Sequence, residues 1–139
     1  MHLLDTDTLT HAHAGHAGIA ERVERVGEET VATTVVNAIE ILRGRHEFVL
    51  KASDGKQLLR AQQLLERSEE LLASVNIIAI NAATAAEFDR LRKNKRLKVM
   101  RRADLLIASI ALAHRATLVT RNLKDFRQIP GLQLENWLD

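Results

Sequence analysis

The chain of 139 residues contains no cysteine, no tyrosine, one proline and six glycines. The absence of cysteine excludes disulfides, thiol catalysis and cysteine-ligated zinc sites, and it is typical of a reducing compartment. We therefore expect a cytoplasmic protein. The scarcity of proline and glycine, beside abundant alanine and leucine, favours a helix-rich fold.

Long hydrophobic runs are also missing. The longest uncharged stretch, residues 71–86, has 16 residues and includes the polar Ser74, Asn76, Asn81 and Thr84. It is too short and too polar to cross a membrane. Asp5 interrupts the N-terminus before any apolar signal segment, so we expect neither a signal peptide nor membrane association.

The composition predicts a globular protein. Hydrophobic residues make up 46% of the chain, which is enough for a packed interior and argues against disorder. A chain of this length favours one core, and we expect a single domain over residues 1–139.

Short apolar runs alternate with amphipathic segments along the chain. We predict strands at 2–4, 30–33, 75–80, 116–120 and 132–136, with those at 75–80 and 116–120 buried. We predict helices at 18–26, 34–50, 56–74, 82–97 and 103–114, and a helix or polar loop at 8–18. This alternation predicts an α/β sandwich with a mostly parallel central sheet, whose ligands bind beyond the carboxyl ends of the strands.

Four polar residues stand where they can converge at that edge. Asp5 follows the first strand, Asn122 follows the 116–120 strand, Asp104 opens an apolar helix, and Glu40 lies among apolar residues of another helix. Carboxylates crowded together repel one another unless a cation is present, and hard oxygen ligands favour Mg²⁺ or Mn²⁺. Such an ion activates water for attack on a phosphodiester.

Each residue also has a purely structural interpretation. Asp104 suits the first turn of a helix, and Glu40 is placed to pair with Arg43 one turn later. Asn122 fits a turn, and Asp7 fits the N-cap of the helix after the first strand. Only the combination of acids favours a functional site.

Two other kinds of site come into question. A haloacid-dehalogenase-like phosphatase begins with a D-x-D-x-T or D-x-D-x-V motif, but here Leu9 occupies the fifth position and no acidic pair follows the 116–120 strand. A zinc site at His11, His13 and His16 is disfavoured because their spacings do not place them on one helix face. We interpret the histidines as a polar surface segment.

Basic residues are concentrated in one segment. The net charge is only +2, but residues 93–102, KNKRLKVMRR, contain six Lys or Arg and no acid. A positive patch of this density suits a polyanion such as nucleic acid, although a solvated helix end has the same composition.

Together, four segments resemble the PIN-domain ribonucleases, and in particular the VapC-type toxins of type II toxin–antitoxin systems. They are LLDTD, VVNAIEILRG, ADLLIASIALAH and LVTRNLKDFRQIPGLQLENW, which stand in the expected order and spacing, and the resemblance extends over essentially the whole chain. The resemblance implies a PIN-like three-layer α/β/α sandwich. It also implies a Mg²⁺-dependent endoribonuclease, with Mn²⁺ as a possible substitute, a cognate antitoxin that blocks the acidic crevice, and a homodimer.

The resemblance also assigns roles to individual residues. Asp5, Glu40 and Asp104 match the family's acids and are the expected metal ligands. Asn122 falls at the family's fourth acidic or amide position, where it is expected to hydrogen-bond a metal-bound water, and Thr120 is expected to hold the acids in place. The residues expected to guide the RNA backbone are Arg96, Lys98, Arg101, Arg102 and Arg121.

The sequence departs from the family pattern at two places. Asp7 stands where many members have Asn, and the KVMRRA segment before Asp104 is basic where relatives often carry a glycine and a polar residue. Two alternative functions remain open: a PIN-fold RNA-processing nuclease with no toxin role, and an inactive module that binds RNA or protein.

Overall fold

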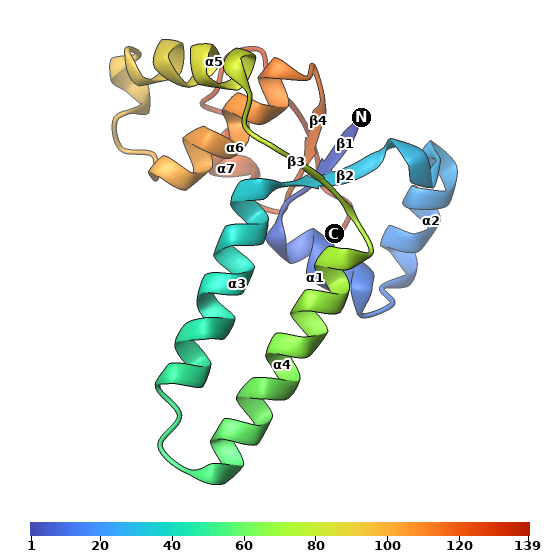
Figure 1. Cartoon of the computed structure of the whole chain (residues 1–139). Helices are drawn as coiled ribbons and strands as arrows, with labels where there is room; N and C mark the ends of the chain where they lie inside the picture. The colour runs from blue at the N-terminus through green and yellow to red at the C-terminus, as the bar shows by residue number, and fades with distance from the viewer.

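The protein, described here by a computed structural model of residues 1–139, is built on one five-stranded sheet (Figure 1). All neighbouring strands are parallel, in the order β3-β2-β1-β4-β5. The strands are β1 (His2–Leu4), β2 (Val31–Thr34), β3 (Asn76–Ile78), β4 (Thr117–Val119) and β5 (Gln133–Glu135). This architecture confirms the predicted α/β fold.

Helices cover both faces of the sheet. They are α1 (Thr6–His13), α2 (Ala17–Val26), α3 (Val35–Leu50), α4 (Gly55–Ala73), α5 (Ala82–Arg92), α6 (Arg102–Ala113) and α7 (Leu123–Phe126), with 3-10 turns η1 (Glu28–Thr30) and η2 (Lys95–Leu97). No helix is both long enough and apolar enough to cross a membrane.

Alternation along the strands creates two separate hydrophobic clusters. In β1, Leu3 packs into the larger cluster with α5 and α6, whereas its neighbour Leu4 packs into the smaller one with α1 and α2. Leu118 and Val119 of β4 divide in the same way. Because successive side chains of a strand point to opposite faces, a parallel sheet with apolar residues at both positions is covered on both sides. The result is the three-layer sandwich that the resemblance implied.

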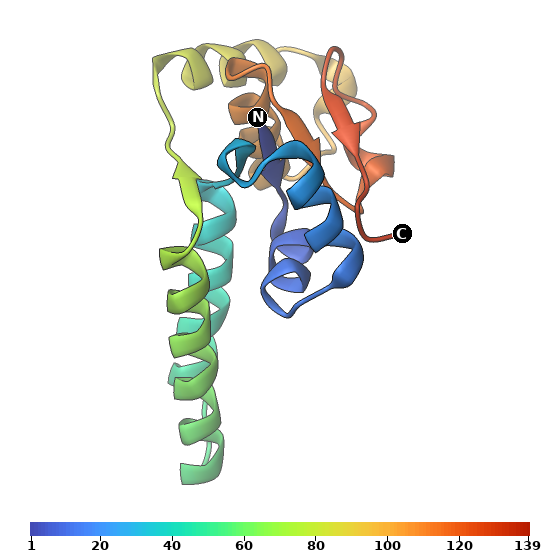
Figure 2. The same cartoon turned by 90° about the vertical axis from the view of Figure 1, so that its right-hand side faces the viewer.

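Helices α3 and α4 form a hairpin that extends away from the sheet (Figure 2). Thr34 caps α3 by accepting a hydrogen bond from the backbone of Asn37, and Asp54 caps α4 by accepting one from Gln57. The prediction that Thr33 or Thr34 begins the first of these helices is confirmed. Arg45 donates to Ser68 at 3.0 Å and joins the two helices partway along the hairpin.

Several details differ from the sequence-based expectations. The VNIIAI segment is not a buried strand: β3 lies at the edge of the sheet, and Ile77 and Ile80 are exposed. The helix predicted at 82–97 ends at Arg92 and continues only as the turn η2. Residues 123–126, predicted as loop, form the short helix α7.

The sheet brings the polar residues that follow its strands to one edge. Asp5 comes directly after β1, and its backbone N–H donates to the carbonyl of Val119 at the end of β4. Thr120 follows β4, and α3 starts immediately after β2. The carboxyl ends of the three central strands therefore form the floor of the candidate site.

Candidate active site

Asp5 is the most tightly held acid of the site. Its Oδ1 accepts hydrogen bonds from the backbone N–H of Thr6 at 3.0 Å and from Nδ2 of Asn37 at 2.8 Å. Its Oδ2 accepts one from Oγ1 of Thr120 at 2.8 Å. These three donors fix both oxygens and leave about one of the roughly four acceptor positions of a carboxylate open. Asp5, and not Asp7 as predicted, is also the N-cap of α1.

Asn37 is a residue of the site that the sequence did not reveal. It is fully buried, and besides Asp5 it donates to Oγ1 of Thr6 at 3.0 Å. Its own side-chain oxygen accepts from Oγ1 of Thr34 at 2.6 Å. A buried amide with every polar atom satisfied holds a fixed orientation. The available signal was a single amide inside the apolar stretch VVNAIE, three residues before Glu40 and so on the same side of the helix.

Glu40 and Asp104 face each other across one guanidinium group. Nη2 of Arg101 lies 3.0 Å from Oε2 of Glu40, and Nε of Arg101 lies 3.6 Å from Oδ2 of Asp104. The two acids come from α3 and α6, so Arg101 links helices that are distant in sequence. The alternative pairing of Glu40 with Arg43 is wrong, because Arg43 pairs instead with Glu47.

Asp104 lies close enough to the other acids for their charges to affect its pKa. Burial raises the pKa of Asp104 above its ordinary value, and the Arg101 guanidinium acts in the opposite direction. The negative charges of Asp5, Glu40 and Asp125 raise that pKa further. The structure thus brings together the three predicted acids, with Asp125 as a fourth.

Asn122 lies at the rim of the site. Its backbone N–H donates to Oγ1 of Thr120 at 3.0 Å, and its Nδ2 donates to Oδ2 of Asp125 at 3.1 Å. Thr120 therefore connects Asn122 to Asp5 through two successive hydrogen bonds. The side chain of Asn122 makes no cap bond to α7 although it stands at the N-cap position.

The carboxylate oxygens of the site suit a hard divalent cation, but they do not form a complete coordination site by themselves. No group of three His, Asp or Glu side chains is arranged so that it could hold a metal ion. Mg²⁺ commonly needs only one or two protein carboxylates, with water and substrate phosphate completing its shell. Asp5 and Asp104, with Glu40 nearby, meet that smaller requirement.

The predicted RNA-binding residues divide into two groups. Arg96, Lys98 and Arg102 are exposed on or near η2 and the start of α6, and they make no ion pair. Arg101 is turned onto the acids, and Arg121 lies 3.5 Å from Asp139. Only the first group offers unpaired positive charge.

His11 and His16 serve local structure. His16 caps α2 by accepting a hydrogen bond from the N–H of Ile19 at 3.1 Å, and Nδ1 of His11 lies 2.7 Å from the carbonyl oxygen of Asp7. One ring nitrogen of each is thus engaged with a nearby backbone group, and His13 is exposed.

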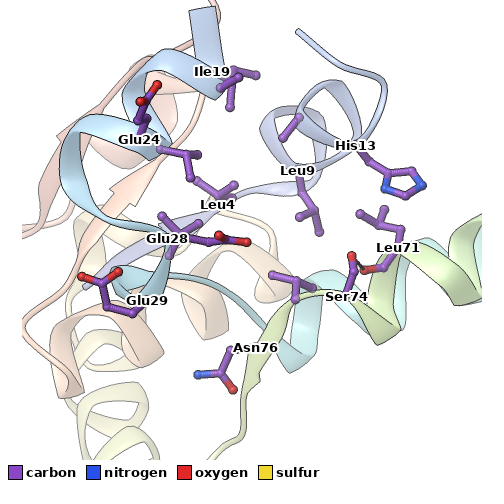
Figure 3. A pocket seen from close by; sticks show the side chains of 15 residues that line it. Leu4, Leu9, His13, Ile19, Glu24, Glu28, Glu29, Leu71, Ser74 and Asn76 are labelled. Carbon is purple, nitrogen blue, oxygen red and sulfur yellow. Dashed lines mark hydrogen bonds between the residues drawn. The ribbon is translucent and has the colours of Figure 1, made fainter. Parts of the chain in front are cut away.

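A pocket lies apart from the acids, between α1, α2, η1 and the end of α4 (Figure 3). It has a volume of about 800 Å³, and none of the three acids lines it. Leu4, Leu9 and Leu71 turn toward the hollow, and three glutamates lie along one side of it. These are Glu24, Glu28 and Glu29. Sequence reasoning did not identify this pocket, because its residues come from five separate segments.

Comparison with known proteins places these features in a family. The PIN domain family model matches residues 3–132. Ribonuclease VapC2 of Rickettsia felis is 39% identical over 80 residues, which cover 56% of this chain and 60% of that protein. Ribonuclease VapC1 of Haemophilus influenzae is 27% identical over 139 residues, which cover 99% of this chain and 98% of that protein.

Solved structures show the same fold. A chain of VapBC2 from Rickettsia felis, bound to a DNA fragment from its promoter, superposes with a TM-score of 0.78 at 29% identity, with 98% of each chain covered. A chain of VapBC-1 from nontypeable Haemophilus influenzae gives a TM-score of 0.80 at 23% identity, with 99% of this chain and 98% of that chain covered. The family match spans nearly the whole sequence, and the chain therefore belongs to the PIN domain family.

Proposed function

We propose that the protein is a Mg²⁺-dependent endoribonuclease and the toxin of a type II toxin–antitoxin pair. The observation that carries this proposal is the convergence of Asp5, Glu40 and Asp104, with Asp5 fixed by three hydrogen bonds. The similarity to VapC ribonucleases supports RNA as the substrate.

Each residue of the site has a distinct role in the proposed reaction. Asp5 and Asp104 hold the divalent cation, and Glu40 helps to hold it or orients the attacking water. When bound, the cation polarises the phosphodiester and stabilises the charge that develops on it. Asn37 and Thr120 keep the Asp5 carboxylate in one orientation, which matters because misplaced ligands lose catalytic efficiency. At the rim of the acid site, Asn122 donates a hydrogen bond to a water molecule or accepts one from it. It does not act as a base.

The RNA backbone approaches along the segment that precedes Asp104. Arg96, Lys98 and Arg102 are exposed there, near the first turn of α6. Their charges attract phosphates without reading the base sequence, so their contribution weakens as salt increases.

The apolar pocket suits an antitoxin segment. Its lining is apolar and its glutamates are exposed, so it fits an amphipathic helix that carries Lys or Arg beside its apolar face. The solved relatives are VapBC toxin–antitoxin complexes, which supports a protein partner of this kind. A basic side chain of the same antitoxin would reach the acid site and block it.

We also propose a homodimer in the cytoplasm. The hairpin of α3 and α4 exposes apolar side chains at Phe48, Leu50, Leu58 and Leu59. Surface of this kind on a projecting element suits another protein chain. Light scattering of the purified protein tests this proposal, with Leu59→Glu expected to favour the monomer.

The nuclease proposal is tested by incubating antitoxin-free protein with structured RNAs in Mg²⁺ or Mn²⁺. We expect cleavage that disappears with EDTA and in Asp104→Ala. No cleavage of any RNA, together with no metal-induced thermal shift, favours an inactive binding module. Cleavage without growth arrest on expression, and without an adjacent antitoxin reading frame, favours an RNA-processing nuclease.

A further inference from the structure

Arg101 is the only basic residue that pairs with any of the three acids. Its Nη2 lies 3.0 Å from Glu40 Oε2 and its Nε lies 3.6 Å from Asp104 Oδ2. One guanidinium thus neutralises part of the charge on two acids that come from different helices. Arg102, the next residue, is also exposed to solvent and makes no ion pair.

The backbone explains why Arg101 reaches both acids. Arg101 is the N-cap of α6 in an extended conformation, with φ −60° and ψ 143°, and its side chain makes no cap hydrogen bond. Asp104 lies three residues later, in the first turn. From the N-cap, a long side chain lies across that turn, so Arg101 extends over Asp104 toward Glu40 on α3.

The ion pairs of Arg101 are easily replaced. The Arg101 side chain is 66% exposed, whereas those of its partners Glu40 and Asp104 are 34% and 13% exposed. Because the guanidinium itself lies in solvent, water screens its ion pairs and lowers their contribution to stability, more for Glu40 than for Asp104. The side-chain hydrogen bonds to Asp5 come instead from Asn37 and Thr120, which are both buried.

We propose that Arg101 competes with the divalent cation for Glu40 and Asp104 and thereby lowers the metal affinity of the site. This inference rests on the proposed metal-dependent function. Arg101 lies against one oxygen of Glu40 and one of Asp104, and a guanidinium and a divalent ion bound to the same two carboxylates repel each other. The Arg101 guanidinium therefore leaves the acids when the cation binds, and its exposed side chain has solvent to move into.

If Arg101 instead positions the two acids for the cation, the expected change in metal affinity has the opposite sign. If the guanidinium mainly held Glu40 and Asp104 at the spacing that the cation requires, its removal would weaken metal binding. The two roles are therefore distinguished by the sign of one change in affinity.

The experiment is a calorimetric titration of the full chain with Mn²⁺ at low ionic strength. We compare the wild type with Arg101→Ala, Arg101→Lys and the matched control Arg102→Ala. From the usual strength of ion pairs made by a solvent-exposed arginine, we expect Arg101→Ala to bind Mn²⁺ about threefold to thirtyfold more tightly. Arg101→Lys should lie between Arg101→Ala and the wild type, because a lysine keeps the charge without the two-nitrogen fork.

The control separates competition from general electrostatics. Arg102→Ala removes one positive charge beside the same site, so its effect on Mn²⁺ affinity measures long-range repulsion alone. We expect it to be clearly smaller than that of Arg101→Ala. Circular dichroism spectra identical to that of the wild type establish that each variant is folded.

Two results overturn the inference in distinguishable ways. If wild type and Arg101→Ala bind Mn²⁺ with equal affinity, or Arg101→Ala binds more weakly, Arg101 does not compete although the metal site stands. If none of the variants binds Mn²⁺, the metal site of the proposed function is wrong and the inference is wrong with it.

Discussion

The acid site and the apolar pocket are two regions of one small protein, and they are built in opposite ways. The acid site is polar, and hydrogen bonds from the buried residues Asn37 and Thr120 fix its first acid. The pocket is lined mainly by apolar side chains and carries exposed glutamates along one side. The first arrangement places a charge accurately, which chemistry requires, and the second offers apolar area, which protein association requires.

The largest effect on the acid site is expected from a substitution of Asp5. We expect Asp5→Asn to reduce RNA cleavage by at least about 100-fold, because it removes a negative ligand of the cation. Asn retains an oxygen for the hydrogen bonds from Thr6 and Asn37, so the fold should persist. Cleavage assays check the rate, and thermal unfolding checks the fold.

Asp5→Ala is the contrasting variant. It also removes the N-cap of α1 and leaves the buried donors of Asn37 and Thr120 unpaired. We expect it to lose about 1–3 kcal/mol of unfolding free energy relative to Asp5→Asn. Wild-type cleavage by Asp5→Asn contradicts the assignment of the site.

The next effect concerns the buried amide that orients Asp5. We expect Asn37→Ala to reduce cleavage about 10- to 100-fold, the usual result of removing a group that positions a metal ligand. Asn37→Asp, which keeps the shape but introduces a buried charge beside Asp5, should be at least as inactive. A rate unchanged in folded Asn37→Ala protein shows that Asp5 does not need this support.

A smaller effect is expected at the pocket. The double variant Glu24→Lys with Glu28→Lys should weaken binding of a synthetic amphipathic Leu/Lys helix about tenfold at low salt, because attraction becomes repulsion. The matched control is Glu66→Lys with Glu69→Lys, which makes the same charge change on the exposed surface of α4. Equal weakening in both variants contradicts the pocket as the binding site.

RNA cleavage by this pocket variant should be unchanged. The acids do not line the pocket, so a loss of activity would show that the two regions are coupled.

The smallest effect is on the pH dependence of stability. The pKa of Asp104 is raised in the folded protein, so the native state binds more protons than the unfolded state between pH 3.8 and the raised value. Stability therefore falls as pH rises through that window. We expect Asp104→Asn to remove this fall and to be at least as stable as the wild type at neutral pH, as measured by urea unfolding in EDTA. A steeper loss of stability in Asp104→Asn than in the wild type contradicts the direction of the shift.

The sequence predicted the parts of the site that follow from strand ends and motifs. Asp5, Glu40 and Asp104 stand at positions that a parallel sheet brings together, and the structure places them so. The sandwich followed from the alternation of elements. Whether the protein forms one domain, binds Mg²⁺ and dimerises stays a prediction.

Other features were out of reach because they depend on contacts between distant segments. The apolar run of β3 gave no sign that it lies at the sheet edge, since strand order is set by tertiary packing. Arg101 looked like part of an RNA-binding patch, because a basic run does not show that one side chain folds back onto Glu40. The role of Asn37 likewise appears only when Asp5, 32 residues away in sequence, is in place.

The most direct test of the account is the position of a bound metal. Crystals soaked in Mn²⁺ and measured at the manganese absorption edge locate the ion by its anomalous scattering. We predict a peak within coordination distance of Asp5 and Asp104, with the Arg101 guanidinium moved away from Glu40. A peak only among the glutamates of the apolar pocket, or no peak at a saturating Mn²⁺ concentration, contradicts the account.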